Sequence, residues 1–467
     1  MEKLLIAFII ILMTGPVLAQ QNGQNLQVSQ NGHYLQYGDG RPFFWLGDTA
    51  WELFHRLRLE EIVQYLDNRE SKGFNVVQAV IITELDGVKS ANRYGDLPII
   101  DGDPDRPNED YFKLVDTVVA LAAKRGMVMA LLPAWGDKFT LKYGGTGPVI
   151  FNPDNAYRYG KYLGQRYDRF NNIVWVLGGD RPPQDDTEDW KPVYSALAKG
   201  IDDGAGKPSL KTFHPGGYVW ESSVYLHGQP WLDFNMNQSG HAVKDQPVWK
   251  TITRNWGLKP TKPTLDGEPN YEDHPVNPWP TWDPKRGYFR DHDVRKQLYR
   301  SVFAGGFGVA YGHHAIWQFY SPLVEKLNYP DRYWTEALDR PGAFQAGYLK
   351  RLILSRPPLD RFPDQSLIVN GQGNTDAEHI VAFRDADGSY AMIYLPVGKA
   401  VEINMEWIKG KKINAWWFNP RTGKSGRKST FRVDRAYRFV PPTLGGKNDW
   451  VLVIDDAAKR YPRPGAH

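Results

Sequence analysis

Between residues 43 and 354 of this 467-residue chain, short apolar runs alternate with longer amphipathic segments. This alternation is typical of repeated strand–helix units, whose strands align in a parallel sheet. We predict strands at eight of the apolar runs: residues 43–47, 75–82, 127–133, 173–178, 210–214, 234–237, 263–267 and 308–315. The amphipathic segments between them predict seven helices: residues 59–72, 111–125, 155–170, 188–202, 242–255, 293–304 and 344–354.

Eight strands with interleaved helices predict an α/β fold of the (β/α)8 TIM barrel type. In such barrels the functional groups lie on the loops that follow the carboxyl ends of the strands. Two of these loops, residues 86–110 and 269–293, are long and rich in Gly, Pro, Asp and Trp. Loops of that length in a compact domain are usually functional or disordered, and we expect these to be functional.

The segments on either side of the barrel have a different pattern. Turn dipeptides at Asn31-Gly32 and Asp39-Gly40 predict a small strand meander over residues 24–42. Beyond residue 367 short strands follow one another without helices, which predicts an antiparallel β-sandwich. Its strands are expected at residues 379–384, 390–396, 401–407, 412–418 and 450–455. We therefore expect a barrel domain with its meander over residues 20–362 and a sandwich domain over residues 363–467.

Residues 1–19 have the pattern of a secretory signal peptide. Lys3 precedes an apolar run that stops at Thr14-Gly15-Pro16, and small residues precede a cleavage site after Ala19. The alternative, an uncleaved membrane anchor, needs about 20 continuous apolar residues, and this run is roughly half as long. The chain has no cysteine, which excludes disulfides and a cysteine-linked lipid anchor. We expect a periplasmic or secreted bacterial protein with no membrane attachment after cleavage.

The composition limits the classes of partner. With 57 Lys and Arg against 53 Asp and Glu, the formal charge is +4, and we see no clustered basic face in the sequence. Nucleic acid and anionic membranes are therefore not expected as partners. Aromatic residues are abundant, with 17 Trp, 25 Tyr and 21 Phe, so some are available for a binding surface.

Two predicted strands end on acidic residues. The apolar run 173–178 leads into Gly179-Asp180, and the strand at 263–267 leads into Glu268. By our count these are the fourth and seventh barrel strands. Two carboxylates across a barrel mouth are what glycosidic cleavage requires, because one protonates the leaving oxygen while the other attacks the anomeric carbon or activates water. Their separation would decide the stereochemistry, about 5 Å for retention and more for inversion.

A purely structural interpretation of these acids is also open. Asp180 could cap the following turn, and Asp266 and Glu268 could pair with an arginine. The presence of both signals on matching strands of one barrel favours catalysis. Other chemistries lack a motif: no Ser or Cys lies in a nucleophile elbow, and no phosphate-binding loop is present. Adjacent strand residues His313 and His314 would point to opposite faces, so we expect no metal and no cofactor.

Several further residues near predicted strand ends are candidates for substrate binding. Their indole, imidazole, amide, phenol and carboxylate groups can cover a sugar ring or hydrogen-bond its hydroxyls. The candidates are Trp45, Asp48, Trp135, His214, Asn237, Gln238, Tyr271, His313 and Trp317. Core packing and loop hydrogen bonding remain alternative roles, and for Asp48 the alternative is a cap of the turn at Thr49.

Three segments carry a resemblance to a known family. The run 44–51 (FWLGDTAW), the Gly178-Gly179-Asp180 strand end and the run 266–272 (DGEPNYE) resemble the apiosidase-like glycoside hydrolases, glycoside hydrolase family 140. The resemblance extends through the C-terminal run 416–423 (WWFNPRTG) and so covers nearly the whole mature chain. In that family the barrel is commonly followed by a β-sandwich described as collagen-binding. For this chain, packing of the sandwich against the barrel is the alternative role.

The resemblance implies a retaining, exo-acting enzyme that releases apiose from the pectic polysaccharide rhamnogalacturonan-II. It implies Asp180 as acid/base and Glu268 as nucleophile, which requires the pKa of Asp180 to be raised by an apolar environment or a neighbouring carboxylate. The wider clan usually has Asn-Glu at the end of the fourth strand, where this chain has Gly179-Asp180. Two alternatives stay open: a glycosidase of the same fold acting on another plant-polysaccharide sugar or within a chain, and a non-catalytic carbohydrate- or matrix-binding protein. We expect a plant cell-wall oligosaccharide or polysaccharide substrate and a monomer.

Overall fold

The computed structural model describes residues 25–216, 219–276 and 283–466, so the expected signal peptide lies outside the described residues. Eight parallel strands form one sheet in the order β8-β7-β6-β5-β4-β11-β10-β9. Their bounds are β4 Trp45–Thr49, β5 Val76–Ile82, β6 Val128–Ala134, β7 Ile173–Gly178, β8 Lys211–His214, β9 Asn235–Asn237, β10 Thr264–Asp266 and β11 Gly308–Tyr311. The two end strands meet through a 2.9 Å bond from the Asp233 amide to the Lys211 carbonyl and a 2.7 Å bond from Thr212 Oγ1 to the Phe234 carbonyl. The predicted (β/α)8 barrel is confirmed.

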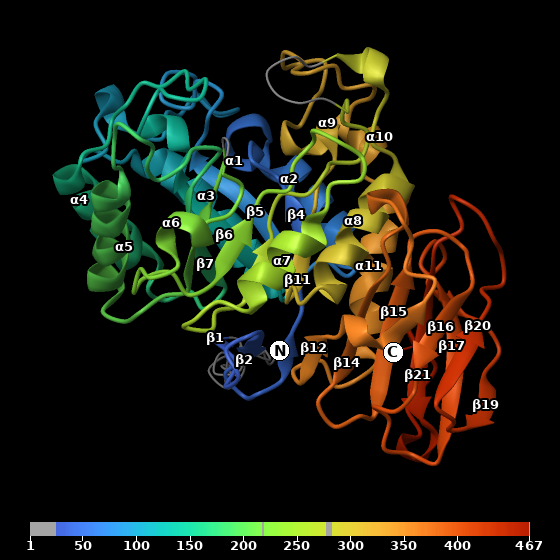
Figure 1. The fold of residues 1–467 in the computed structure, drawn as a ribbon. Coiled ribbons are helices and arrows are strands. Elements are labelled where there is room, and N and C mark those ends of the chain that lie inside the picture. Colours follow the sequence, from blue (N-terminus) through green and yellow to red (C-terminus); the bar gives the residue numbers. More distant parts are fainter. Residues whose placement is uncertain (1–24, 217–218, 277–282, 467) are drawn as a thin grey trace, which may run out of the picture.

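Helices surround the barrel in the expected alternation (Figure 1). The seven long ones are α2 Leu59–Ser71, α3 Glu109–Lys124, α4 Pro153–Tyr167, α5 Lys191–Ala205, α7 Val248–Trp256, α8 Asp291–Phe303 and α11 Pro341–Leu354. Four single-turn helices lie in the loops: α1 Leu53–Arg56, α6 Ser223–Leu226, α9 His314–Trp317 and α10 Trp334–Ala337. The last predicted strand was too long, because β11 ends at Tyr311 and α9 begins three residues later.

The N-terminal meander closes the end of the barrel opposite the mouth. It consists of β1 Leu26–Val28, β2 Leu35–Tyr37 and β3 Pro42–Phe43, paired antiparallel as the turn dipeptides predict. Its Tyr34, Leu35 and Phe43 side chains join the apolar core inside the barrel. The meander thus leaves the carboxyl ends of the strands as the open face.

The C-terminal part folds into two antiparallel sheets with an apolar core between them. The larger sheet has the order β12-β14-β15-β21-β17-β18, with β19 also paired to β17, and the smaller has the order β13-β16-β20. The bounds are β12 Arg361–Pro363, β13 Ile368–Asn370, β14 Val381–Asp385, β15 Tyr390–Leu395, β16 Val401–Asn404, β17 Lys412–Asn419, β18 Lys424–Ser425, β19 Ser429–Arg432, β20 Ala436–Phe439 and β21 Trp450–Asp456. The expected sandwich is confirmed, with more strands than the five that the sequence indicated.

The larger sheet packs on α8 and α11, on the outside of the barrel (Figure 1). The rings of Tyr299 and Tyr394 stack at 4.9 Å between centroids, and those of Phe303 and Phe383 meet edge-on at 4.8 Å. Arg295 of α8 reaches across and donates two hydrogen bonds to buried Asp449, at 2.7 and 2.9 Å. One continuous apolar core therefore joins the barrel helices to this sheet.

The charge distribution differs from the expectation in one respect. Residues 409–438, which include β17, β18, β19 and most of β20, contain ten lysines and arginines and a single aspartate. The expectation that no basic cluster exists was wrong, because the near-neutral total hid a segregation of charge along the chain. Within the described ranges, no helix is long and apolar enough to span a membrane.

Candidate active site

Asp180 lies just beyond β7 in an unusual backbone conformation. Gly178, Gly179 and Asp180 have consecutive positive φ angles of 87°, 124° and 52°. A positive φ is accessible to glycine but uncommon and strained for an aspartate, and such strain clusters at functional sites. The two glycines before Asp180 therefore allow the chain to turn sharply and present this carboxylate at the barrel mouth.

Neighbouring loops press against this turn. A Cβ on Gly136 would lie 2.1 Å from the Gly179 carbonyl oxygen, and one on Gly216 would lie 2.2 Å from Cα of Asp180. The Gly179 amide also donates to the His214 carbonyl at 3.0 Å. The loops after β6 and β8 thus fix the position of Asp180, and neither can carry a side chain at the point of contact.

Glu268 lies two residues beyond β10, with a buried aspartate before it. Asp266 accepts hydrogen bonds from Ser239 Oγ at 2.7 Å and Ser301 Oγ at 3.1 Å, so its role is structural. Gly267 then passes so close to Met236 that a Cβ would lie 2.6 Å from the sulfur. The Glu268 side chain, only 6% exposed, turns into the mouth beside Asp180.

The two carboxylates approach each other across His214 of β8. His214 Nε2 lies 3.0 Å from Glu268 Oε2, and its Nδ1 lies 3.9 Å from Asp180 Oδ1. Single oxygens of Asp180 and Glu268 lie within 4.8 Å of each other. Gln238 Nε2 donates to Asp180 Oδ1 at 2.7 Å, and His241 Nε2 lies 3.2 Å from Glu268 Oε1. The pair predicted from two distant strand ends therefore forms one site.

The surroundings shift the pKa values of Asp180 and Glu268 in opposite directions. Burial, followed by the negative charge of Glu268, raises the pKa of Asp180 above its ordinary value. Burial alone would also raise the pKa of Glu268, but hydrogen bonds from His214 and His241 outweigh it and hold that pKa well below the usual range. Burial alone would lower the pKa of the His214 imidazole, but the hydrogen bond to Glu268 and the negative charge of Glu268 outweigh it and raise that pKa. Two carboxyl groups with separated pKa values can serve as acid and as nucleophile at one pH.

A third carboxylate, Glu84, lies at the edge of this site. Arg181 links it to the turn that carries Asp180, because Nη2 donates to Glu84 Oε1 at 3.0 Å and Nη1 donates to the Asp180 carbonyl at 2.9 Å. Burial and the charge of Asp180 raise the pKa of Glu84 to about 7. The Glu84 side chain is 28% exposed, so it is accessible at the rim.

Several other predicted binding residues lie around the pair. Trp135 packs against His214 with 5.6 Å between ring centroids. The amide of Tyr271 donates to His241 Nδ1 at 3.3 Å, and the charges of Glu268 and Asp180 add to burial in raising the pKa of the Tyr271 phenol. Trp317 is half-buried against the apolar cluster that contains Trp135. Trp135, His214, Gln238 and Tyr271 therefore lie around the acidic pair, and a substrate contact of Trp317 stays a prediction.

Four predicted residues have other roles, and the structure corrects them. Trp45 begins β4 and is fully buried against Phe234 and Phe307 at the far end of the barrel. The Asn237 side chain bonds outward to Thr251 and Asn255 of α7.

Asp48 is buried on the outer side of β4. It accepts 2.6 Å bonds from Tyr65 and Arg69 of α2, which is neither the expected sugar contact nor the alternative turn cap. His313 caps α9 and lies 3.2 Å from Asp273, outside the barrel mouth.

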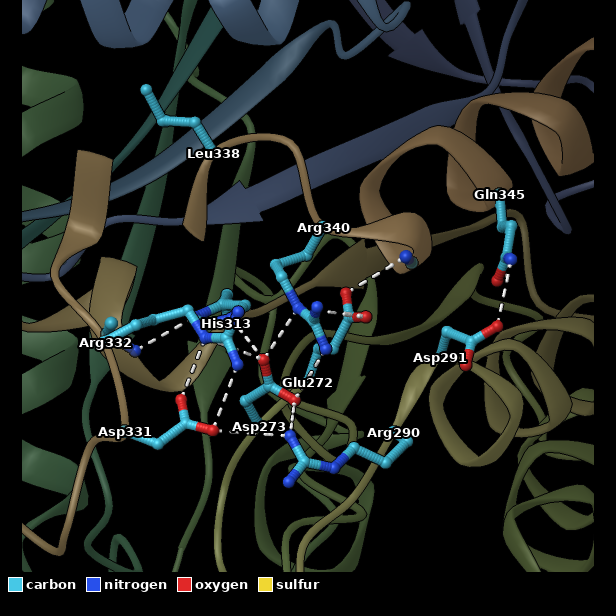
Figure 2. Close-up of polar contacts among 12 residues, drawn as sticks. Glu272, Asp273, Arg290, Asp291, His313, Asp331, Arg332, Leu338, Arg340 and Gln345 are labelled. Atoms are coloured by element: carbon cyan, nitrogen blue, oxygen red, sulfur yellow. Dashed lines mark hydrogen bonds and ion pairs between the residues drawn. The ribbon is translucent and has the colours of Figure 1, made fainter. Parts of the chain in front are cut away.

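The acidic residues that follow Tyr271 form a separate ion-pair cluster (Figure 2). Asp273 is fully buried and faces Arg290, Arg332, Arg340 and His313. Glu272 accepts bonds from Tyr311 Oη at 2.6 Å and from the Gly342 amide at 3.0 Å. This cluster joins the loop after β10 to the first turns of α8 and α11, so its role is structural.

Sequence reasoning missed His241, Glu84 and Arg181. Glu84 follows β5 by two residues, so the rule that found Asp180 at a strand end could have found it. His241 directly precedes the predicted helix 242–255, but the helix that forms, α7, begins only at Val248, so His241 lies in a loop. Its contact with Glu268 depends on the path of the loop after β9 and is visible only in three dimensions.

Asp180, His214 and Glu268 are also the group in the described part of the chain that could hold a metal ion. The same three residues suit acid–base and nucleophilic chemistry without a metal, because each carboxylate already has hydrogen-bond donors. The expectation of a metal-free enzyme therefore stays a prediction, which a chelator experiment tests.

A comparison with protein-family models matches residues 29–360 to "Apiosidase-like, catalytic domain". The chain belongs to the apiosidase-like family. Residues 362–455 match the model described as "Putative collagen-binding domain of a collagenase". A comparison with curated proteins found no match.

Solved structures agree with the membership in the apiosidase-like family. A glycoside hydrolase family 5 protein from Bacteroides vulgatus ATCC 8482 is 33% identical with a TM-score of 0.85, over 94% of this chain and 95% of that one. A structure titled only "Glycoside hydrolase" is 34% identical with the same TM-score, over 94% of this chain and 98% of that one. The chain is a glycoside hydrolase, an enzyme class that needs two carboxyl groups at the scissile bond. Asp180 and Glu268 stay the predicted pair.

Proposed function

We propose that this enzyme is a retaining, exo-acting glycosidase that releases apiose from side chains of rhamnogalacturonan-II. The observation that carries the mechanism is the pair Asp180 and Glu268, with oxygens within 4.8 Å and pKa values shifted apart. Retaining glycosidases have carboxyl groups about 5 Å apart, whereas inverting enzymes need roughly 6.5–9.5 Å to admit a water. The sugar itself is proposed from the family, whose name refers to apiosidases.

In the first step, Glu268 attacks the anomeric carbon while Asp180 donates its proton to the departing glycosidic oxygen. The C–O bond to the leaving group breaks as an ester bond to Glu268 forms. His214 and His241 hold Glu268 ionised and oriented, because both donate to its carboxylate. The raised pKa of Asp180 favours the protonated form that this step requires.

In the second step, Asp180 has lost its proton and acts as a base. It removes a proton from a water that attacks the anomeric carbon, and the ester to Glu268 breaks. The sugar leaves with its original anomeric configuration, and Asp180 is protonated again. Gln238, which donates to Asp180 Oδ1, orients the carboxylate for both transfers.

We also propose that the mature protein acts in the periplasm or outside the cell as a monomer, after removal of residues 1–19. A pectic polysaccharide outside the cell fits that location. The alternative within the same class is another pentose or deoxysugar at the same carboxylates, or cleavage within a chain. A binding protein without turnover is disfavoured because both carboxylates and their hydrogen-bond partners are in place.

The test is incubation of the mature enzyme with rhamnogalacturonan-II side-chain oligosaccharides, followed by identification of the released monosaccharide. We expect apiose from the parent, and a loss of about three orders of magnitude or more for Asp180→Ala and Glu268→Gln. Release of a different sugar from another pectic fragment would replace the substrate. Parent-like rates in both variants would overturn the assignment of the site.

An aryl glycoside of the released sugar separates the two roles. A phenolate with a low pKa leaves without protonation, so Asp180→Ala should still form the glycosyl-enzyme quickly with this substrate. Glu268→Gln should stay inactive on it, because the nucleophile is missing. Equal losses for both variants on the aryl glycoside would contradict the assignment of Asp180 as the acid.

A further inference from the structure

The C-terminal domain carries a dense group of unpaired positive charges on strands β17, β19 and β20 and on the segments next to them. Residues 409–438 hold ten lysines and arginines and one aspartate, although the whole chain has a formal charge of only +4. Nine of these ten side chains are exposed, and eight of the nine form no ion pair with a carboxylate among the described residues. The proposal uses six of the eight: Lys411, Lys412, Arg427, Lys428, Arg432 and Arg438. We call these six residues the basic strip.

The strand register brings members of the basic strip onto one face. Lys412 of β17 and Arg432 of β19 are direct cross-strand partners, so both side chains point to the same side. The cross-strand pair two residues further along, Asn414 and Thr430, points to that same side, and Thr430 Oγ1 donates to Asn414 Oδ1 at 2.9 Å. Like charges directly opposite each other destabilise a sheet, and no carboxylate of the described residues relieves this pair. An anion bound from outside would remove that repulsion.

The C-terminal tail adds positive charge beside the basic strip. Lys459, Arg460 and Arg463 are exposed and follow β21, whose Asp456 pairs with Ile413, the neighbour of Lys412. Ser425 Oγ of β18 donates to the Pro464 carbonyl at 2.8 Å, which fastens the far end of the tail to the same sheet. The tail is thus held next to β17 and β18, and its cations extend the strip.

Protection of a free sheet edge explains only part of this pattern. Exposed edge strands often carry lysine or arginine to prevent pairing with another chain, and all four residues of β19 are exposed. That purpose accounts for Arg432 on β19. It does not account for Lys412 on β17, which is an inner strand between β19 and β21, or for the three cations of the tail.

We propose that the basic strip binds a carboxylate-bearing polysaccharide and anchors the enzyme to an acidic polymer. The positive charges select a polyanion, and the glycoside hydrolase barrel in the same chain favours a polysaccharide over other polyanions. β19 lies at the outer edge of the C-terminal domain, away from the barrel (Figure 1), so a bound polymer leaves the mouth free. This anchor does not depend on which sugar the barrel releases.

The experiment measures retention of the full-length Glu268→Gln variant on immobilised polygalacturonate at low salt, with neutral dextran as the control matrix. We expect binding to polygalacturonate alone, falling steeply as salt is raised. On this background, the change Lys412→Glu should weaken binding by about tenfold, and adding Arg432→Glu should remove it. The double change Lys161→Glu and Lys207→Glu, at exposed lysines of the barrel domain, should leave binding unchanged.

The Lys412→Glu variant is expected to stay folded, so that a loss of binding can be assigned to the lost charge. It replaces a like-charge pair by an opposite-charge pair across the strands, so the melting temperature should not fall. In the Glu268 parent, both strip variants should hydrolyse a small soluble substrate at the normal rate. Absence of binding to polygalacturonate, or binding that Lys412→Glu and Arg432→Glu do not weaken, would overturn the proposal. Tighter binding to duplex DNA or to collagen than to polygalacturonate would overturn it as well.

Discussion

The proposed catalytic acid, Asp180, depends on the charges that surround it. Asp180 has a raised pKa because it is partly removed from water and lies beside ionised Glu268. Glu84 contributes from the rim, where Arg181 holds it next to the turn that carries Asp180. The protonation of Asp180 is therefore a property of three carboxylates together.

The substitution Glu84→Gln tests this coupling. It removes a negative charge near Asp180. It also removes the carboxylate that pairs with Arg181, so the positive charge of Arg181 acts more strongly on Asp180. Both effects favour the ionised form of Asp180. The pKa of Asp180 should fall, so the basic limb of the kcat/KM pH profile should move to lower pH by about one unit. Glu60→Gln on the exposed face of α2 is the matched control and should not move the limb. A limb that stays in place, or that moves to higher pH, would contradict the coupling.

Removal of metal is a second test at this scale. Asp180, His214 and Glu268 could form a cation site, but the proposed mechanism needs no metal. Dialysis against EDTA should leave kcat and KM unchanged, and added Mg²⁺ or Zn²⁺ should not activate. Loss of activity that Zn²⁺ restores would mean that the three residues serve as metal ligands.

The sequence identified the acidic pair but not its neighbours, and the reason is geometric. Asp180 and Glu268 each follow a strand, and the carboxyl ends of parallel strands meet at one face. Whether a strand residue points into the mouth or outward depends on register, which the sequence leaves open. Asp48 looked like a mouth residue but points outward to Arg69, and Trp45 lies at the opposite end of its strand.

Among the elements, the contact between α4 and α5 depends on glycine. A Cβ on Gly164 would lie 2.1 Å from the Ile201 carbonyl oxygen, and one on Gly204 would lie 2.2 Å from the Lys161 carbonyl oxygen. The two helices can approach this closely because each presents a side without side chains. The sequence shows the helices, but their backbone contact becomes visible only in the structure.

The substitution Gly164→Ala should therefore separate the two helices. We expect a loss of about 1–3 kcal/mol in the free energy of unfolding, measured by urea denaturation, while kcat of the folded enzyme is kept. Gly228→Ala is the control, since a Cβ at Gly228 has no neighbour within 4 Å. Equal stability of the two variants would contradict the close contact.

The ion-pair cluster after β10 makes a prediction about pH. Burial, opposed by the hydrogen bond from Tyr311, raises the pKa of Glu272 to about 7. The folded state therefore holds its proton more tightly than the unfolded chain, and ionisation of Glu272 costs stability as pH rises from about 4.5 to 7. Glu272→Gln should match the parent melting temperature near pH 4 and exceed it near pH 8. A gap that is constant with pH would show that Glu272 does not titrate in this way.

At the scale of the whole molecule, the barrel and the C-terminal domain share one apolar core and a buried ion pair. Arg295 of α8 donates two bonds to Asp449, whose Oδ2 also accepts from Tyr394 Oη at 3.1 Å. The sequence indicated two domains but not this connection, because the partners are 154 residues apart. We expect the two domains to unfold together.

Calorimetry of Asp449→Ala tests that expectation. The parent should unfold in one transition. The variant should unfold in one transition at a lower temperature, because buried Arg295 loses two of its charge-assisted hydrogen bonds and keeps only Asp291 as a counter-charge. Removing one partner of a buried pair costs about 3–5 kcal/mol. Asp186→Ala, at an exposed aspartate, should leave the transition unchanged. Two separate transitions in the parent would show that the domains are independent.

The central claim is that Glu268 forms a covalent bond to the sugar and that Asp180 is needed to release it. Intact-protein mass spectrometry of Asp180→Ala, mixed with an aryl glycoside of the released sugar, tests it directly. We predict that phenol release is followed by a stable mass increase of one glycosyl unit, located on the peptide that contains Glu268. Phenol release with no adduct, or with an adduct on another carboxylate, would contradict the account.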